Sequence, residues 1–242
     1  MCRYERAGIL CALGRYEEAL QEINAVLPIR QRVSGSEHPD TLLARYERAA
    51  ILRSLGRNDE ALQEIDSLLP KRAEVSGAEH PDTLWARYER AAILRADGRY
   101  EQALQEIDAV LQTRNKASGG GHPDTLLARY ERTVILYSLE RYEEALQEID
   151  ALLPIREQVS GGEHPETLLA RYERAAILRS LGRNDEALQE IDSLLPNRAE
   201  VSGAEHPDTL WARYERAGIL CALRCFDEAL QEIDAVLRIR NK

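Results

Sequence analysis

Residues that could support redox or metal chemistry are scarce in this sequence. Its 242 residues include four cysteines, Cys2, Cys11, Cys221 and Cys225, and all of them stand near the two ends. A disulfide framework would be expected to staple every part of the chain, but the middle has no cysteine. Cys221 and Cys225 also lack a nearby histidine that would complete a zinc site. We therefore expect structural or incidental thiols and no metal.

Long apolar runs are also missing. No stretch approaches the ~20 residues that a membrane-spanning helix needs, and the sequence shows no secretory leader. The composition, with 44% hydrophobic residues, 31% charged residues and a net charge of −10, is typical of a folded helical protein. The acidic balance disfavours nucleic acid as a partner. We expect a cytoplasmic protein that binds neither membranes nor nucleic acid.

Histidine occurs only five times, and its spacing reflects the organisation of the chain. The histidines follow one another at intervals of 42 residues, at His38, His80, His122, His164 and His206. A fixed period of this length indicates a repeat array. We expect one array across residues 1–242, with units at 1–37, 38–79, 80–121, 122–163, 164–205 and 206–242.

Each unit contains two stretches of helical periodicity, which Gly56-Arg57 separates in the second unit. The first stretch has a helix-start signal at His38-Pro39-Asp40, and Gly56 suits a left-handed C-terminal cap. One such hairpin cannot bury its own apolar stripe, so neighbouring hairpins must stack. The predicted stripes are Leu42, Ala49, Leu52 and Leu55 in the first helix and Ala61, Leu62, Ile65, Leu68 and Leu69 in the second.

Two local substitutions lead to further expectations. Pro70 stands late in the second helix, where another unit has Gln112. We expect this helix to continue past the proline, with a kink, to about Val75. Glu140 and Arg224 replace the turn glycine in two units. Because a left-handed conformation costs a non-glycine residue about 1 kcal/mol, we expect these two turns to be looser.

The order A-x2-L, then G-R-Y/N-x-E-A-L, together with the HPDTL linker and the 42-residue period, resembles the tetratricopeptide repeat in its longer form. That form is known from kinesin light chains. The resemblance covers essentially the whole chain and implies an all-α, right-handed superhelical solenoid of six helix-turn-helix repeats, with the first helices lining a concave groove. Arg45 and Arg48 stand where the family usually has large apolar residues. We expect their stems to pack and their guanidinium groups to reach polar partners.

The sequence contains no convincing catalytic constellation. A histidine before proline at a helix start is read as a cap, and acidic pairs such as Asp59-Glu60 suit the positive end of a helix dipole. The glycine clusters are turns between repeats, with no strand before them that would make a phosphate loop. We therefore predict no catalytic, cofactor-binding or metal-binding residue and no enzyme activity.

Variation along the first helices suggests a binding surface. One position, seven residues after a recurrent tyrosine, reads Cys11, Arg53, Arg95, Tyr137, Arg179 and Cys221 in units that are otherwise near copies. Drift at exposed sites, with the arginines paired to nearby glutamates, is the alternative explanation. By helical spacing and family resemblance, the predicted groove residues are Leu43, Tyr46, Arg53, Trp85, Tyr88, Arg95, Tyr130, Tyr137, Tyr172, Arg179, Trp211 and Tyr214.

The function that follows is a non-catalytic protein-interaction scaffold with a partner peptide in the groove. The tyrosines would supply flat contact area, and the arginines would engage acidic side chains or a C-terminal carboxylate. The alternative is a regulatory or sensor segment of a larger signalling protein, such as a repeat-bearing NTPase. The terminal units also predict head-to-tail self-association, through Leu220, Leu230, Ile233 and Leu237 at one end and Ile9, Leu10, Leu20 and Ile23 at the other.

Overall fold

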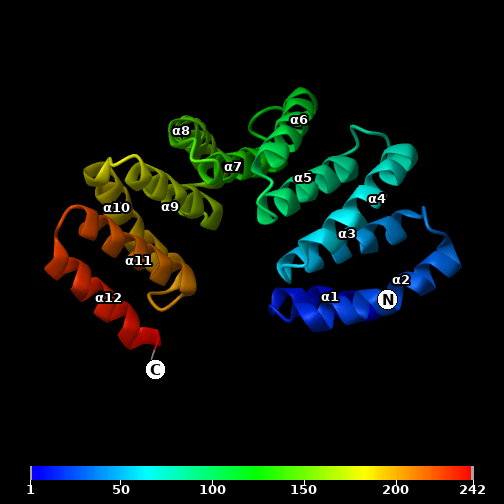
Figure 1. The fold of residues 1–242 in the computed structure, drawn as a ribbon, viewed down its shortest axis with the longest axis horizontal. Helices are drawn as coiled ribbons and strands as arrows, with labels where there is room; N and C mark the ends of the chain where they lie inside the picture. Colours follow the sequence, from blue (N-terminus) through cyan, green and yellow to red (C-terminus); the bar gives the residue numbers. More distant parts are fainter. Residues whose placement is uncertain (1, 241–242) are drawn as a thin grey trace. The chain divides into compact units, whose positions relative to one another are not determined.

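Twelve helices and no strands make up the part of the chain that this computed structural model describes, residues 2–240 (Figure 1). The predicted all-α fold of six helical hairpins is confirmed. The helices are α1 Cys2–Ala12, α2 Tyr16–Ser34, α3 Pro39–Ser54, α4 Asn58–Ser76, α5 Pro81–Ala96, α6 Tyr100–Ser118, α7 Pro123–Ser138, α8 Tyr142–Ser160, α9 Pro165–Ser180, α10 Asn184–Ser202, α11 Pro207–Ala222 and α12 Phe226–Arg240.

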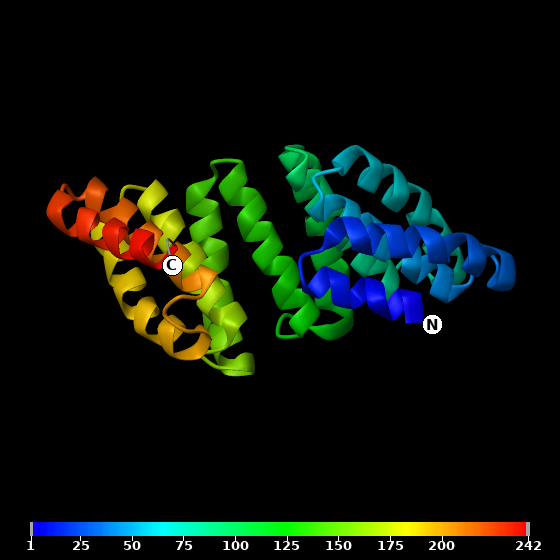
Figure 2. The ribbon, with the colours of Figure 1, turned by 90° about the horizontal axis from the view of Figure 1, so that it is seen from below.

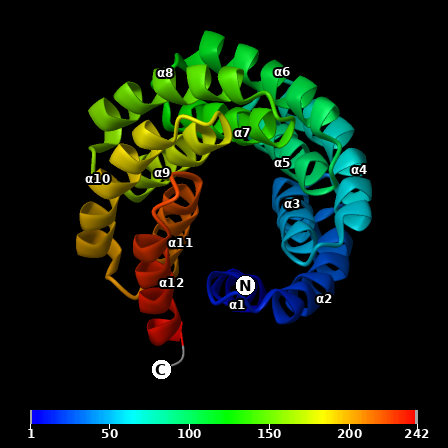
Figure 3. The same ribbon diagram turned by 60° about the vertical axis from the view of Figure 1, so that its left-hand side comes forward.

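The chain divides into two compact units, with the boundary between Ala117 and Ser118. The first unit contains α1 to α6 and the second contains α7 to α12. Within each unit, every hairpin packs against the next, as α4 does against α5 and α10 against α11. Figure 2 shows the stacked hairpins of each unit, and in Figure 3 the helices α3, α5, α7 and α9 lie on the inner side of their unit's curve, with α4, α6, α8 and α10 on the outer side.

Histidine caps the odd-numbered helices α3, α5, α7, α9 and α11, as predicted. The Nδ1 atom of His38 accepts a hydrogen bond from the backbone N–H of Asp40 at 3.2 Å, and Pro39 occupies the first turn. His80 does the same for α5. The ring therefore satisfies one of the backbone donors that a helix start leaves unpaired.

The turns inside the hairpins are uniform, and the expectation of looser turns at Glu140 and Arg224 is wrong. Gly56 has φ 72°, and Glu140 and Arg224 adopt the same left-handed conformation at φ 58° and 64°. The N–H of Gly56 donates to Arg53 at 2.9 Å, and the N–H of Glu140 donates to Tyr137 at 3.0 Å. The packed helices on both sides impose the turn conformation. Glu140 and Arg224 adopt it at a conformational cost of about 1 kcal/mol each.

Proline does not end the even-numbered helices. Pro70 lies inside α4, which continues to Ser76, close to the predicted end at Val75. Gly77 then follows at φ 102°, a conformation that favours glycine. Proline has no backbone N–H, so α4 lacks one internal hydrogen bond at Pro70, and the helix nevertheless continues for six more residues.

The core follows the predicted stripes except at their edges. Leu55 and Leu69 are only partly buried, because they lie at the sides of their stripes. The buried members are Leu42, Ala49, Leu52, Ala61, Leu62, Ile65 and Leu68. Among the residues described, no helix combines the length and the apolar character needed to cross a bilayer.

Candidate interaction surface

Paired arginines join the two helices of each hairpin. Arg45 Nε donates to Glu64 at 2.5 Å, and Arg48 donates to the other oxygen of the same carboxylate at 2.6 Å. Arg48 Nε also donates to Asn24 of the preceding repeat at 2.8 Å. The expectation that these arginines reach polar partners is confirmed. The arrangement recurs as Arg87 and Arg90 with Glu106, Arg129 and Arg132 with Glu148, and Arg171 and Arg174 with Glu190.

A second row of arginines is nearly buried, and sequence analysis missed it. Arg72 of α4 lies over the Tyr46 ring at 5.7 Å and donates to the backbone carbonyl of Asp82, in the first turn of the next repeat, at 3.0 Å. Its position was a usable signal, because it continues the apolar stripe of Ile65 and Leu68 at helical spacing. The same contact is made by Arg30 with Tyr4, Arg114 with Trp85, Arg156 with Tyr130 and Arg198 with Tyr172.

These arginines limit what the predicted groove tyrosines can offer to a partner. Tyr46, Tyr130 and Tyr172 are half-buried, and an arginine covers one face of each ring. Burial is the main reason that the pKa of Tyr172 is raised to about 12. Tyr214 in α11 is exposed instead. The tyrosines therefore contribute to the joints between helices as well as to the surface.

The predicted groove arginines Arg53 and Arg179 have partners inside the fold. Arg53 Nε donates to Glu89 in the next odd-numbered helix at 2.7 Å, and Arg179 Nε donates to Glu215 at 2.5 Å. Pairing of these arginines with nearby glutamates is what we expect if the variable position reflects drift at exposed sites and not selection for a partner. Tyr137 occupies the same position in α7, and its hydroxyl accepts a hydrogen bond from Ser180 at 3.2 Å. Arg95 lies at the equivalent place in the last turn of α5.

Apolar and aromatic side chains remain exposed along the odd-numbered helices. Leu43 in α3, Leu169 in α9 and Trp211 in α11 are all exposed. Trp85 and Tyr88 pack edge to face with ring centroids 5.4 Å apart, as do Trp211 and Tyr214 at 6.2 Å. We use the name first-helix face for the exposed strip of the odd-numbered helices in each of the two compact units, which includes Leu43 in the first and Leu169 and Trp211 in the second. The predicted groove residues all belong to odd-numbered helices.

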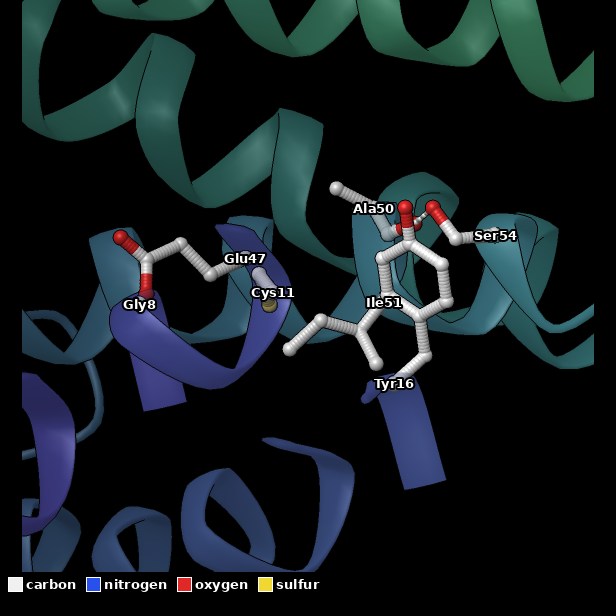
Figure 4. Close-up of a pocket in the computed structure, with 7 residues that line it drawn as sticks. All are labelled: Gly8, Cys11, Tyr16, Glu47, Ala50, Ile51 and Ser54. Carbon is white, nitrogen blue, oxygen red and sulfur yellow. Dashed lines mark hydrogen bonds between the residues drawn. The ribbon is translucent and has the colours of Figure 1, made fainter. Parts of the chain in front are cut away.

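A small cavity opens where the first repeat meets the second (Figure 4). Its volume is about 260 Å3. The Glu47 carboxylate lies at one end and the Tyr16 ring at the other, with Cys11 and Ile51 between them. Gly8, Ala50 and Ser54 complete the lining.

Cysteine and acidic side chains do not assemble a metal site among the residues described. No group of three or more His, Cys, Asp or Glu side chains gathers there. Cys11, Cys221 and Cys225 are free thiols. The side chain of Cys2 lies outside the described part of the structure. The histidines are helix caps.

Comparison with known families gives one result that extends over most of the chain. The tetratricopeptide repeat profile matches residues 3–64, 43–105, 82–147 and 134–190. A comparison with curated protein sequences finds no match.

Several solved structures share this fold. A putative kinesin light chain with nearly identical TPR-like repeats, from Podosopora anserina, superposes with a TM-score of 0.73 at 24% identity, covering 84% of this chain and 96% of that one. BtubC from P. vanneervenii gives a TM-score of 0.78 at 14% identity over 93% and 91% of the two chains. A Rap protein complexed with Competence and Sporulation Factor gives 0.71 at 13% identity over 99% and 74%. At these identities the likeness concerns the fold alone.

Proposed function

The chain belongs to the tetratricopeptide repeat family, which supports a general role as a protein-interaction scaffold, and we propose that a partner peptide lies along its first-helix face. The observation that carries this proposal is the exposure of Leu43, Leu169 and Trp211 on the odd-numbered helices. Exposed aromatic and aliphatic side chains at the inner side of a curved unit give a peptide apolar area to bury.

An acidic segment or a C-terminal carboxylate is the partner chemistry that Arg53, Arg95 and Arg179 favour. A guanidinium group carries five N–H donors, so a partner carboxylate can share Arg179 with Glu215, which accepts from Nε at 2.5 Å. Such a contact adds to the apolar contacts and is sensitive to salt, because exposed charges are screened over about 10 Å at 0.1 M.

Site-specific crosslinking tests where the peptide lies. A photoreactive amino acid is placed at Leu43, Leu169 or Trp211, and matched controls carry it at Gln63 or Gln189, which are exposed on even-numbered helices. Peptides selected from a random library against the 242-residue chain should crosslink at the first three positions and not at the controls. Acidic sequences should be enriched, and added salt should weaken their binding. Crosslinks mainly from Gln63 and Gln189 would place the partner on the other layer and contradict the proposal.

A second interaction proposal concerns the outer side of α12, where we propose that α1 of a second copy docks. Residues 3–12 and residues 213–222 have identical sequences, so α1 carries the surface that α11 presents to α10. Ile9 is 63% exposed, whereas its equivalent Ile51 is 4% exposed. Leu230 is 62% exposed, whereas its equivalent Leu20 is 6% exposed. The terminal repeats thus expose the residues that interior joints bury.

Charge supports the same joint. Arg216 Nε donates to Asp192 of the preceding repeat at 2.6 Å, and the equivalent residues at the two ends are Arg6 and Asp234. Of the residues predicted for this contact, Leu10, Leu20, Ile23 and Leu220 are buried, Ile233 is partly buried, and Ile9, Leu230 and Leu237 are exposed.

The joint can be tested with variants that each disable one end. The wild-type chain should show a light-scattering mass that rises with concentration, and Ile9→Glu and Leu230→Glu should each remain monomeric. Mixing the two variants should restore dimers and nothing larger, because one intact joint remains. Gln231→Glu adds the same charge at an exposed neighbouring site and should behave as wild type. A wild-type chain that is monomeric at every concentration would rule out the contact.

A further inference from the structure

Two joints between successive odd-numbered helices, α3 with α5 and α9 with α11, contain a buried ion pair that the first joint lacks. Arg53 Nε donates to Glu89 at 2.7 Å in the second joint, and Arg179 Nε donates to Glu215 at 2.5 Å in the last. The Glu89 side chain is 4% exposed, and the Glu215 side chain is 10% exposed. In the first joint, Cys11 stands at the arginine position and Glu47 stands at the glutamate position.

The cavity at this joint is lined by the residues that correspond to the arginine and glutamate of those two pairs. Cys11 and Glu47 both line it, and its volume of about 260 Å3 lies below the ~300–1,000 Å3 of sites for drug-sized molecules (Figure 4). Gly8 enlarges the space further, since no heavy atom lies within 4 Å of the position that a Cβ would take there. The room suits a single side chain, with Tyr16 and Ile51 as apolar walls for its stem.

Glu47 is a half-buried carboxylate without the arginine partner that its equivalents Glu89 and Glu215 have. It accepts a hydrogen bond from the Tyr4 hydroxyl, and among the residues described no ion pair includes it. Burial raises the pKa of Glu47, an effect that the Tyr4 hydrogen bond and the charge of Arg30 partly offset. A cation in the cavity would relieve this desolvation cost, as Arg53 does for Glu89.

We propose that the cavity binds the guanidinium group of an arginine on a partner segment, with Glu47 as its acceptor. The bound side chain would reproduce the pair that Arg53 forms with Glu89. This inference rests on the proposed function in that the arginine is carried by a peptide on the first-helix face. At the first joint, Glu47 would contact a basic residue of the partner, in addition to the acidic partner residues that the arginines of the first-helix face would contact.

The test uses N-acetyl-L-arginine amide as the probe and its citrulline analogue as the uncharged control. With the isoleucine methyl groups isotopically labelled, titration with the arginine probe should shift the NMR signal of Ile51, which lines the cavity. Ile93 and Ile177, equivalent residues buried elsewhere in the array, should not shift. The citrulline probe should bind about tenfold more weakly, because it lacks the charge-assisted hydrogen bond. Equal shifts with both probes would contradict a guanidinium site.

Substitution at the cavity gives an independent readout. Cys11→Arg places the chain's own arginine opposite Glu47, so it should raise the melting temperature and abolish the Ile51 shift. Cys11→Ser keeps the cavity open and should retain the shift, while Glu47→Gln should lose it. A Cys11→Arg variant that is no more stable than wild type and still responds to the probe would overturn the inference. If only this inference fails, selected peptides will still crosslink at Leu43 and Leu169, whereas failure of the proposed function removes those crosslinks.

Discussion

Replacing Arg156 with alanine should lower the free energy of unfolding by about 3–5 kcal/mol. The side chain is 2% exposed and lies over the Tyr130 ring at 5.4 Å. It also donates hydrogen bonds to the Leu126 carbonyl at 3.1 Å and to Glu166 of the next repeat at 3.3 Å. Alanine removes these contacts and leaves a cavity between two hairpins.

The measurement is urea-induced unfolding followed by circular dichroism, with hydrogen exchange to show whether α7 to α9 open first. Arg183→Ala is a matched control, because Arg183 pairs with Glu186 at 2.6 Å on the exposed surface. Such surface pairs contribute at most about 1 kcal/mol. Arg156→Met keeps most of the volume and should cost clearly less than Arg156→Ala. If Arg156→Ala is no more destabilising than Arg183→Ala, the buried arginine row does not hold the repeats together.

Arg53→Ala should also be strongly destabilising, by about 3–5 kcal/mol, because it leaves a buried carboxylate without its cation. The Glu89 side chain is 4% exposed and accepts from Arg53 at 2.7 Å. Adding Glu89→Gln to the variant removes the stranded charge and should restore much of the lost stability. Thermal unfolding of the single and double variants, with Arg57→Ala as an exposed control, measures both effects.

This result bears directly on any binding experiment. A loss of peptide binding in Arg53→Ala would combine a weakened fold with a lost contact. The Arg53→Ala, Glu89→Gln double variant separates the two, because it lacks the arginine but should keep most of the stability. A cost for Arg53→Ala that matches Arg57→Ala, below about 1 kcal/mol, would show that the pair is an ordinary surface contact. An acidic partner could then engage Arg53 at little cost to the stability of the fold.

The repeat, its two helices and their limits were determined by the sequence, because the signals are local. His38 and Pro39 start a helix through contacts within one turn, and Gly56 ends it through its own backbone freedom. The apolar stripes likewise follow from helical spacing alone. The tertiary structure was needed even for the turn at Glu140, where packing imposes a conformation that the residue itself disfavours.

The chemistry of the candidate surface was decided only by the tertiary structure. Arg53 and Glu89 are 36 residues apart in the chain and meet because successive hairpins stack with a particular register. No local rule distinguishes an arginine that pairs inside the fold from one that faces a partner. The cavity beside Glu47 depends on the same register, because Cys11 and Glu47 line it from two stacked odd-numbered helices. Local interactions set the period of this chain, and stacking decides which of its charges are already satisfied.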